Sequence, residues 1–316
     1  GQAVRIFYSG ATNGWIPTLD KAVDDVPSKG NSEGIFGYGN PGGGNQSMTN
    51  LVSNAGVVSS DVTGVGTARS NLSATEYGGD KGIFGYGNPG SPTAVTNLVS
   101  NAGVVASDTT GVGTARYGLG ACGYGGDKGI FGFGIGASVT AVTNLVSNVG
   151  VVSSDVTGVG TARSQNVPAC EYSGDKGIFA FGYADGQTPL IVSVSNLVSN
   201  AGVVASDVAG VGTARYSAAA CSYGYDKGIV AYGNTGSYVS MSNLVSNAGV
   251  VASDVTGVGT ARQNLGATQY GFDKGIFGFG YTTTAVTNLV SNAGVIATDT
   301  AGVGTARYSC DGCSFN

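Results

Sequence analysis

One segment of the sequence recurs six times, and this repetition constrains the fold more than any other feature. Each copy carries GIF or GIV near its start and closes on GTAR. Successive copies lie 45 to 52 residues apart, counted between the arginines that close them: Arg69, Arg116, Arg163, Arg215, Arg262 and Arg307. A fixed period of this length is typical of repeat architectures, in which each copy is one supersecondary unit.

Composition indicates that the repeat unit is built from β-strands. Glycine supplies 57 of the 316 residues, and glycine and β-branched residues both weaken helices. Hydrophobic residues make up 41% of the chain and recur in order, which argues against disorder. Residues 81–87 read KGIFGYG, where large side chains alternate with glycine. Because this alternation marks a strand buried on both faces, we expect the large face of one sheet to pack against the glycine face of its neighbour.

Each copy predicts four short strands. A strand of small residues, such as residues 119–125, comes first, and KGIFGYG comes second. A variable loop follows, and then TNLVS and VVAS flank the tripeptide NAG, which is a tight-hairpin signal. Four short strands in one copy match the size of a propeller blade.

The arginine, the small-residue strand, KGIFGFG and the hairpin together resemble the Kelch or galactose-oxidase type of β-propeller repeat over residues 32–316. Two hallmarks differ, because the double glycine of that family is GYG, GFG or AYG here and the hairpin tryptophan is valine, as at Val104. The copies are also similar to repeats in uncharacterised virion-associated phage proteins of the tail-fibre or adhesin kind. This resemblance implies an all-β propeller of four-stranded blades and a location outside the cell or on a virion.

The two ends of the repeat region each carry an unpaired strand. The tail, residues 308–316, aligns with residues 216–224, so it is a first strand with no second strand after it. Residues 34–39 are a second strand with no first strand before them. We expect these two strands to pair and to close a ring of six blades. Residues 1–31 lie outside the repeat and are interpreted as an N-terminal extension or strap on the domain, or as a connector to another domain or subunit.

The sequence lacks the residues on which several functions depend. It has no histidine, which removes histidine-based triads and the commonest general base. It has no Walker motif, and a net charge of −5 without a basic run argues against nucleic acid as a partner. No apolar run approaches the roughly 20 residues of a transmembrane helix, so we expect no membrane insertion. We predict a protein that is not an enzyme and that uses no cofactor.

Four cysteines occupy one position of the repeat, which two copies fill with threonine. They are Cys122, Cys170, Cys221 and Cys313, with Thr75 and Thr268. A ring of thiolates near an axis would suit metal binding. The two threonines favour the other interpretation, a small buried residue, so we predict no metal site. Cys310 and Cys313 leave a disulfide or redox pair open.

Aspartates recur eight residues before each closing arginine. Symmetric carboxylates would suit calcium, but one acid in each turn is too few for a calcium loop. We interpret them as turn-capping residues that pair with arginine or lysine between blades. The residues assigned to such structural pairs are Asp108, Arg116, Asp155, Arg163, Asp207 and Arg215.

Variation between the copies is concentrated in the six loops that follow the second strands. Loops that differ on a copied scaffold are suited to recognition, and relaxed drift in exposed loops would leave the same pattern. The candidate binding residues in these loops are Tyr183, Asp185, Gln187, Tyr238, Tyr281 and Asn88.

These features predict a non-catalytic structural or binding module, such as a virion fibre, decoration protein or adhesin, that recognises a surface partner through its loops. The expected partners are protein neighbours in a larger assembly or a cell-surface glycan. Two alternatives stay open. A multivalent lectin would stack one sugar on tyrosine in each blade, and a carbohydrate-active enzyme would need two non-equivalent carboxylates facing one pocket.

Overall fold

The computed structural model describes residues 5–8, 15–18, 31–186, 188 and 190–316, and these residues form strands, turns and loops without a helix. Two short strands near the N-terminus, β1 (Arg5–Tyr8) and β2 (Trp15–Thr18), pair with each other in antiparallel fashion. Most of the predicted strap, up to residue 30, lies outside the described residues, so its docking stays a prediction.

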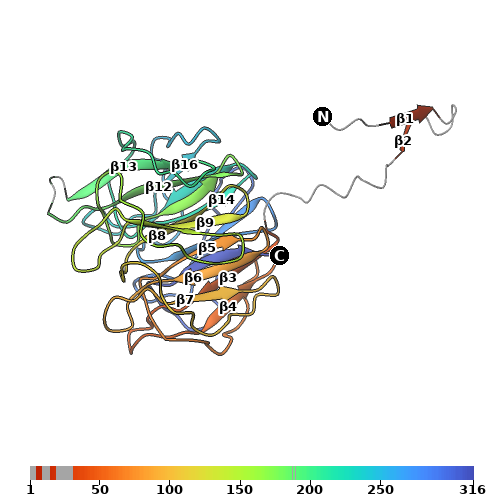
Figure 1. The fold of residues 1–316 in the computed structure, drawn as a ribbon. Coiled ribbons are helices and arrows are strands. Elements are labelled where there is room, and N and C mark those ends of the chain that lie inside the picture. The colour runs from red at the N-terminus through yellow and green to blue at the C-terminus, as the bar shows by residue number, and fades with distance from the viewer. Residues whose placement is uncertain (1–4, 9–14, 19–30, 187, 189) are drawn as a thin grey trace.

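The repeat region forms six antiparallel sheets of three strands each (Figure 1). In every sheet the KGIFG-type strand is the middle one, as its double-sided burial requires. The first sheet joins the two ends of the region, because β20 pairs with β3 through five residues, from Asp311 opposite Gly37 to Phe315 opposite Glu33. The sheets comprise β20 (Asp311–Phe315), β3 (Glu33–Gly37) and β4 (Thr49–Val52); β5 (Ser73–Tyr77), β6 (Lys81–Gly85) and β7 (Thr96–Val99); β8 (Gly120–Tyr124), β9 (Lys128–Gly132) and β10 (Thr143–Val146); β11 (Ala169–Tyr172), β12 (Lys176–Tyr183) and β13 (Ile191–Val198); β14 (Ala219–Tyr223), β15 (Lys227–Ala231) and β16 (Ser242–Val245); and β17 (Gly266–Tyr270), β18 (Lys274–Gly278) and β19 (Thr287–Val290).

The predicted fourth strand is an outer segment that pairs with the sheet through two isolated backbone bridges and not through a continuous ladder. In the first sheet these bridges run from Val52 to Val58 and from Thr49 to Val62. Between them a side chain takes the place of the backbone, since Asn50 Nδ2 donates to the Ser59 carbonyl oxygen (3.0 Å). The same pair of bridges recurs in the other five sheets, so each sheet has three strands where the sequence predicted four.

Neighbouring sheets pack large side chains onto glycine, as predicted. A Cβ atom placed on Gly37 would lie 2.7 Å from Phe84 Cζ, and one placed on Gly85 would lie 2.6 Å from Phe131 Cζ. Both phenylalanines are fully buried. Only glycine leaves room for a ring at this distance, so the glycine-rich second strands set the spacing between sheets.

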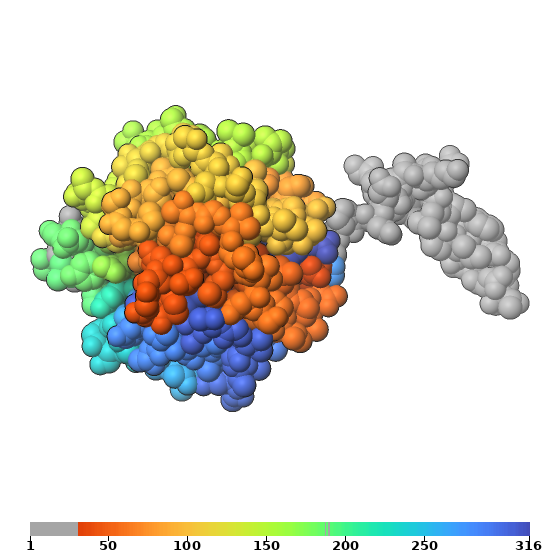
Figure 2. Space-filling view, turned by 90° about the horizontal axis from the view of Figure 1, so that it is seen from below, coloured from red at the N-terminus to blue at the C-terminus, as the bar shows by residue number. Residues whose placement is uncertain are grey.

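The first strands of the six sheets contact one another in the cyclic order β20, β5, β8, β11, β14, β17 and back to β20. The turns after these strands are joined in the same way: the Gly78 N–H donates to the Asp127 carbonyl (2.7 Å), and the Asn316 N–H donates to the Asp80 carbonyl (3.0 Å). Figure 2 shows the red first copy lying between the blue last copy and the orange second copy. The arrangement of sheets is therefore propeller-like.

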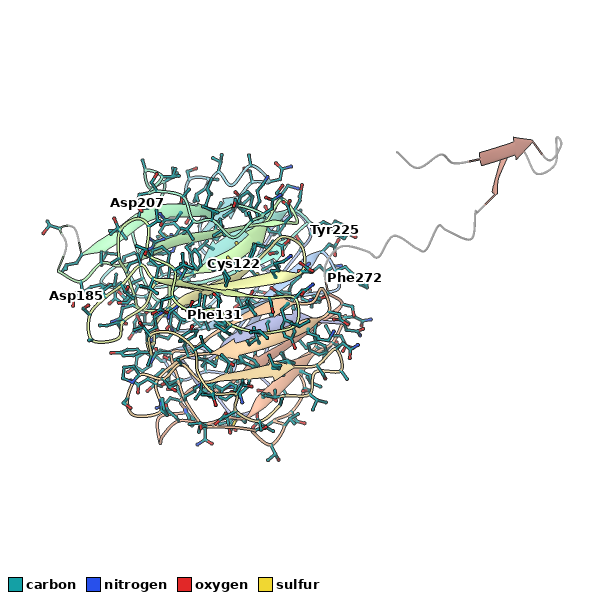
Figure 3. The ribbon with its side chains drawn as sticks, viewed as in Figure 1. Cys122, Phe131, Asp185, Asp207, Tyr225 and Phe272 are labelled. Carbon is teal, nitrogen blue, oxygen red and sulfur yellow. The ribbon has the colours of Figure 1, made fainter. Side chains whose placement is uncertain are left out.

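The molecule has two distinct ends. Asp185, in the loop after β12, lies at one end, while Tyr225 and Phe272, in the turns before β15 and β18, lie at the other (Figure 3). We name the first end the loop face and the second the turn face. The loop face carries the connections that follow the middle strands, namely residues 38–48, 86–95, 133–142, 184–190, 232–241 and 279–286.

Candidate binding face

The loop face is assembled from one backbone bridge in each copy. In each copy the residue three positions after the GIFG, GIFA or GIVA of the middle strand bridges the residue that follows GTAR. In all six bridges the two residues exchange N–H to carbonyl hydrogen bonds, which measure 2.9 and 3.1 Å between Tyr216 and Asn234. The bridges are Asn40 to Tyr308, Ser70 to Asn88, Tyr117 to Ile135, Ser164 to Tyr183, Tyr216 to Asn234 and Gln263 to Tyr281. All six variable loops consequently start from one layer of the structure.

Five tyrosines occupy successive places on this face, and we name them the tyrosine arc. They are Tyr183, Tyr216, Tyr238, Tyr281 and Tyr308. Ring centroids are 5.5 Å apart for Tyr183 and Tyr216, 6.0 Å for Tyr238 and Tyr281, and 5.1 Å for Tyr281 and Tyr308. Asn234 connects the two groups, because it bridges both Tyr216 and Tyr238. Tyr238 and Tyr281 remain 37% and 38% exposed, so the arc is a surface rather than a core.

The remaining part of the loop face carries small and amide side chains in the first two copies, and Tyr117 bridged to Ile135 in the third. Asn88 Oδ1 accepts a hydrogen bond from the Gly90 N–H (2.8 Å), and the Asn88 carbonyl accepts one from Asn45 Nδ2 (2.7 Å). Asn40 Nδ2 in turn donates to Asn45 Oδ1 (3.3 Å). In the first two copies these amides therefore hold the loops in place by hydrogen bonds.

The structure brings together some of the sequence-predicted residues and separates others. Tyr238 and Tyr281 are in direct contact, whereas Tyr183 contacts Tyr216 and neither of these two. Asp185 is exposed at the tip of its loop, and Asn88 lies among the amides of the second copy. Gln187 lies outside the described residues.

Sequence reasoning missed Tyr216 and Tyr308. Both stand directly after GTAR, where other copies have Ser70, Tyr117, Ser164 or Gln263. The alignment of the copies shows tyrosine at the position after GTAR. It does not show that this position lies beside the variable loop that follows the middle strand. The backbone bridge supplies that information.

The arginines that close each copy are fully buried between sheets. Each guanidinium lies 3.9 to 4.3 Å from the centre of an aromatic ring of the preceding sheet. Arg116 also donates from Nε to the Phe133 carbonyl (2.8 Å) and from Nη2 to Asn144 Oδ1 (2.7 Å). Burial lowers the pKa of Arg163 to about 10. These contacts brace neighbouring sheets and leave the arginines no access to a ligand.

The aspartates act between copies, but on different residues than the eight-residue spacing suggests. Asp155 accepts hydrogen bonds from the Thr114 N–H (3.0 Å), Thr114 Oγ1 (2.6 Å) and Asn144 Nδ2 (2.9 Å). Burial raises the pKa of Asp155, but the hydrogen bonds from Thr114 and Asn144 outweigh it and hold the pKa below its usual range. Because GTAR crosses to the next sheet, Arg116 lies near Asp155 rather than Asp108. Arg163 likewise lies near Asp207. Arg215 lies near Asp254, with 3.9 Å between Nη1 and Oδ1.

Each of the four repeated cysteines packs its sulfur against a glycine of the neighbouring sheet. A Cβ atom on Gly177 would lie 2.5 Å from Cys122 Sγ, and one on Gly228 would lie 2.4 Å from Cys170 Sγ. Burial raises the pKa of the Cys170 thiol to about 12. All five cysteines are free and buried, including Cys310 and Cys313. The position serves as a small packing residue against glycine.

A cavity of about 60 Å³ lies among the first strands. It is lined mainly by small residues, and by Glu76, Glu171 and Asp311, which other copies replace with glycine, serine, alanine, proline or glutamine. Asp311 Oδ2 accepts from the Ala74 N–H (2.9 Å), and burial raises the Asp311 pKa to about 7. Sequence reasoning overlooked these acids. The cavity has room for a few waters and is far below the roughly 300 Å³ at which small-molecule pockets begin.

Within the described part of the chain, no group of three or more acidic, cysteine or histidine side chains is arranged to hold a metal ion. The described residues also form no helix that is long and apolar enough to cross a membrane. No family model matches the sequence, and no curated protein matches it either.

Proposed function

We propose that residues 32–316 are a six-bladed β-propeller whose ring is closed by β20 and β3. The cyclic order of the first strands supports this proposal. So does the contact of Thr305 with Asp61, because Thr305 donates to Asp61 from its N–H (3.0 Å) and from Oγ1 (2.6 Å) across 244 residues. These bonds repeat the Thr114–Asp155 contact between consecutive copies.

The propeller serves as a non-catalytic binding module that recognises a surface partner through its loop face. The tyrosine arc carries this proposal, because it gathers five aromatic side chains, of which Tyr238 and Tyr281 are exposed and the others half-buried, on one half of a scaffold whose other surfaces repeat. Aromatic side chains with a polar tip are enriched where proteins bind partners. The setting that fits the resemblance of the repeats is a fibre, decoration protein or adhesin outside the cell or on a virion. A carbohydrate-active enzyme is less well supported, since Glu76, Glu171 and Asp311 line a cavity that is too small for a sugar ring.

The test of this function replaces residues 183–191 with IGAS, the short loop of the third copy. The chimera is expected to melt at the same temperature as the native chain and to bind the surface of intact target cells, or its neighbours in the assembly, more weakly. A matched control exchanges the loop at residues 135–138 for NTGSY from the fifth copy. Full binding by the IGAS chimera, together with loss of binding on mutation of Cys122, would move the site to the central cavity and contradict the proposal.

A further inference from the structure

The tyrosines of the arc exceed what the scaffold requires. Each lies at or beside a bridge that other copies make with a different residue. The Ser70–Asn88 bridge of the second copy uses no aromatic side chain, and Tyr117 meets Ile135 in the third. Ser164 and Gln263 occupy the same position as Tyr216 and Tyr308. Since folding does not need tyrosine at these places, the concentration of five in one half of the face points to a ligand.

The chemistry around the arc is neutral. The six loops contain one charged residue, Asp185, and no lysine or arginine. Two amide residues share backbone bridges with these tyrosines, Asn234 with Tyr216 and Gln263 with Tyr281. Asn234 is buried and donates from Nδ2 to Gln263 Oε1 (2.9 Å), whereas Gln263 remains half-buried beside the arc. Such a surface offers aromatic faces and hydrogen-bonding groups without a charge to attract sulfate, phosphate or carboxylate.

The rings follow one another as a stepped surface. Tyr281 stands at 83° to Tyr238 and at 89° to Tyr308, with centroid distances of 6.0 and 5.1 Å. A pyranose ring has a face of C–H groups that packs on an aromatic ring and an edge of hydroxyl groups that bond to amides. A surface with both groups at successive positions matches an extended chain of sugar units.

We infer that the tyrosine arc is a single extended binding site for a neutral glycan. This inference rests on the proposed function and specifies its ligand. A protein partner fits less well, because a stable interface buries about 800 Å² on each side, whereas two rings of the arc, Tyr238 and Tyr281, are exposed and the other three are half-buried. One chain carries one such site, since the arc spans the fourth to the sixth copies and ends at Tyr308. This differs from a multivalent lectin, which would bind one sugar in every copy.

The test uses the full chain and a panel of immobilised oligosaccharides. Neutral probes are oligomers of glucose, mannose, galactose and N-acetylglucosamine, and charged probes are heparin fragments and sialylated oligosaccharides. We expect at least one neutral probe to bind at one site per chain by calorimetry. Tyr281→Ala should weaken that binding about tenfold, which is the effect of losing one well-packed aromatic contact. Tyr117→Ala is the control, because it removes a tyrosine from the same face outside the arc, and it should bind like the native chain.

Four outcomes would overturn the inference: no binding to any neutral probe at millimolar concentration, preference for the charged probes, close to six sites per chain, or equal losses for Tyr281→Ala and Tyr117→Ala. The loop chimera separates these failures from failure of the proposed function. If no neutral glycan binds while the IGAS chimera still loses surface binding, the loop face is a recognition site for a protein and the glycan assignment is wrong. Unchanged melting curves for both tyrosine variants exclude a folding effect.

Discussion

At the scale of single residues, the six buried arginines carry the strongest structural constraint. Each stacks on a ring and donates to at least one backbone carbonyl. Arg163 lies over the Phe133 ring at 4.0 Å and donates to the carbonyls of Thr161 (3.1 Å) and Phe179 (3.2 Å). The charge itself is costly to bury, which is why the arginine needs every one of these partners.

Arg163→Ala is expected to lower the free energy of unfolding by about 1 to 3 kcal/mol, because the buried Phe179 carbonyl and the half-buried Thr161 carbonyl lose their donor. Urea denaturation measures this change. Lys227→Ala is the control, since Lys227 pairs with its neighbour Asp226 at the surface (3.1 Å), and it should leave stability nearly unchanged. Intact stability in Arg163→Ala, combined with lost binding, would reassign the arginine to a site.

Asp311 gives stability an unusual dependence on pH. Its folded pKa of about 7 exceeds the ordinary value of 3.8, so the folded protein holds this proton more tightly than the unfolded chain. The contribution of Asp311 to stability therefore falls as pH rises from about 4 to about 7. Asp311→Asn removes this penalty while its amide oxygen still accepts from the Ala74 N–H. We expect the melting temperature of the variant to rise relative to the native chain between pH 4.5 and pH 8; a constant difference across this range would contradict the assignment.

Tyr225 on the turn face is strained. Its φ of 69° lies in the left-handed region, where the equivalent residues Gly79, Gly126 and Gly174 have φ between 71° and 81°. Tyr225 is 51% exposed, so packing does little to offset the strain. Tyr225→Gly is expected to raise the free energy of unfolding by about 1 kcal/mol. A loss of stability in chemical denaturation would show that the ring makes a contact worth more than the strain.

At the scale of strands and sheets, the alternation of glycine with phenylalanine determines how one sheet lies on the next. Gly85→Ala is expected to cost about 1 to 3 kcal/mol, because the new methyl group would meet the buried Phe131 ring. Gly43→Ala is the control, since open space surrounds Gly43, whose φ is not positive. Equal melting temperatures for the two variants would mean that the sheets adjust their spacing freely.

The sequence predicted these elements unevenly, for physical reasons. Period-two alternation located the middle strands, and the copy alignment located the β20–β3 pair, because both depend on local pattern. The outer strand was predicted as continuous, although Asn50 and its equivalents replace part of the backbone ladder with side-chain hydrogen bonds. The contact of Asp155 with Thr114 and the gathering of the tyrosines depend on how sheets lie relative to one another. Spacing along the chain does not contain that information.

At the scale of the whole molecule, closure decides whether the repeats behave as a ring or as an open array. An open array unfolds in parts, because each repeat depends only on its neighbours, whereas a closed ring loses all its interfaces together. The strand β20 links the C-terminal end of the repeat region to β3, and it supplies the buried Phe315 and Cys313 to the first sheet. Its removal would also expose the edge of β3 to solvent and to other chains.

Deletion of residues 308–316 is therefore expected to lower the melting temperature by about 10 °C or more, because loss of one buried phenylalanine alone costs about 3 to 5 kcal/mol. The transition should also broaden in calorimetry, as the opened array loses cooperativity. Adding the peptide YSCDGCSFN should restore part of the native transition, since an extended peptide can complete a sheet that lacks a strand. The same peptide with Cys313 and Phe315 equivalents changed to aspartate is the control and should not rescue. An unchanged melting curve after the deletion would rule out a ring held closed by this strand.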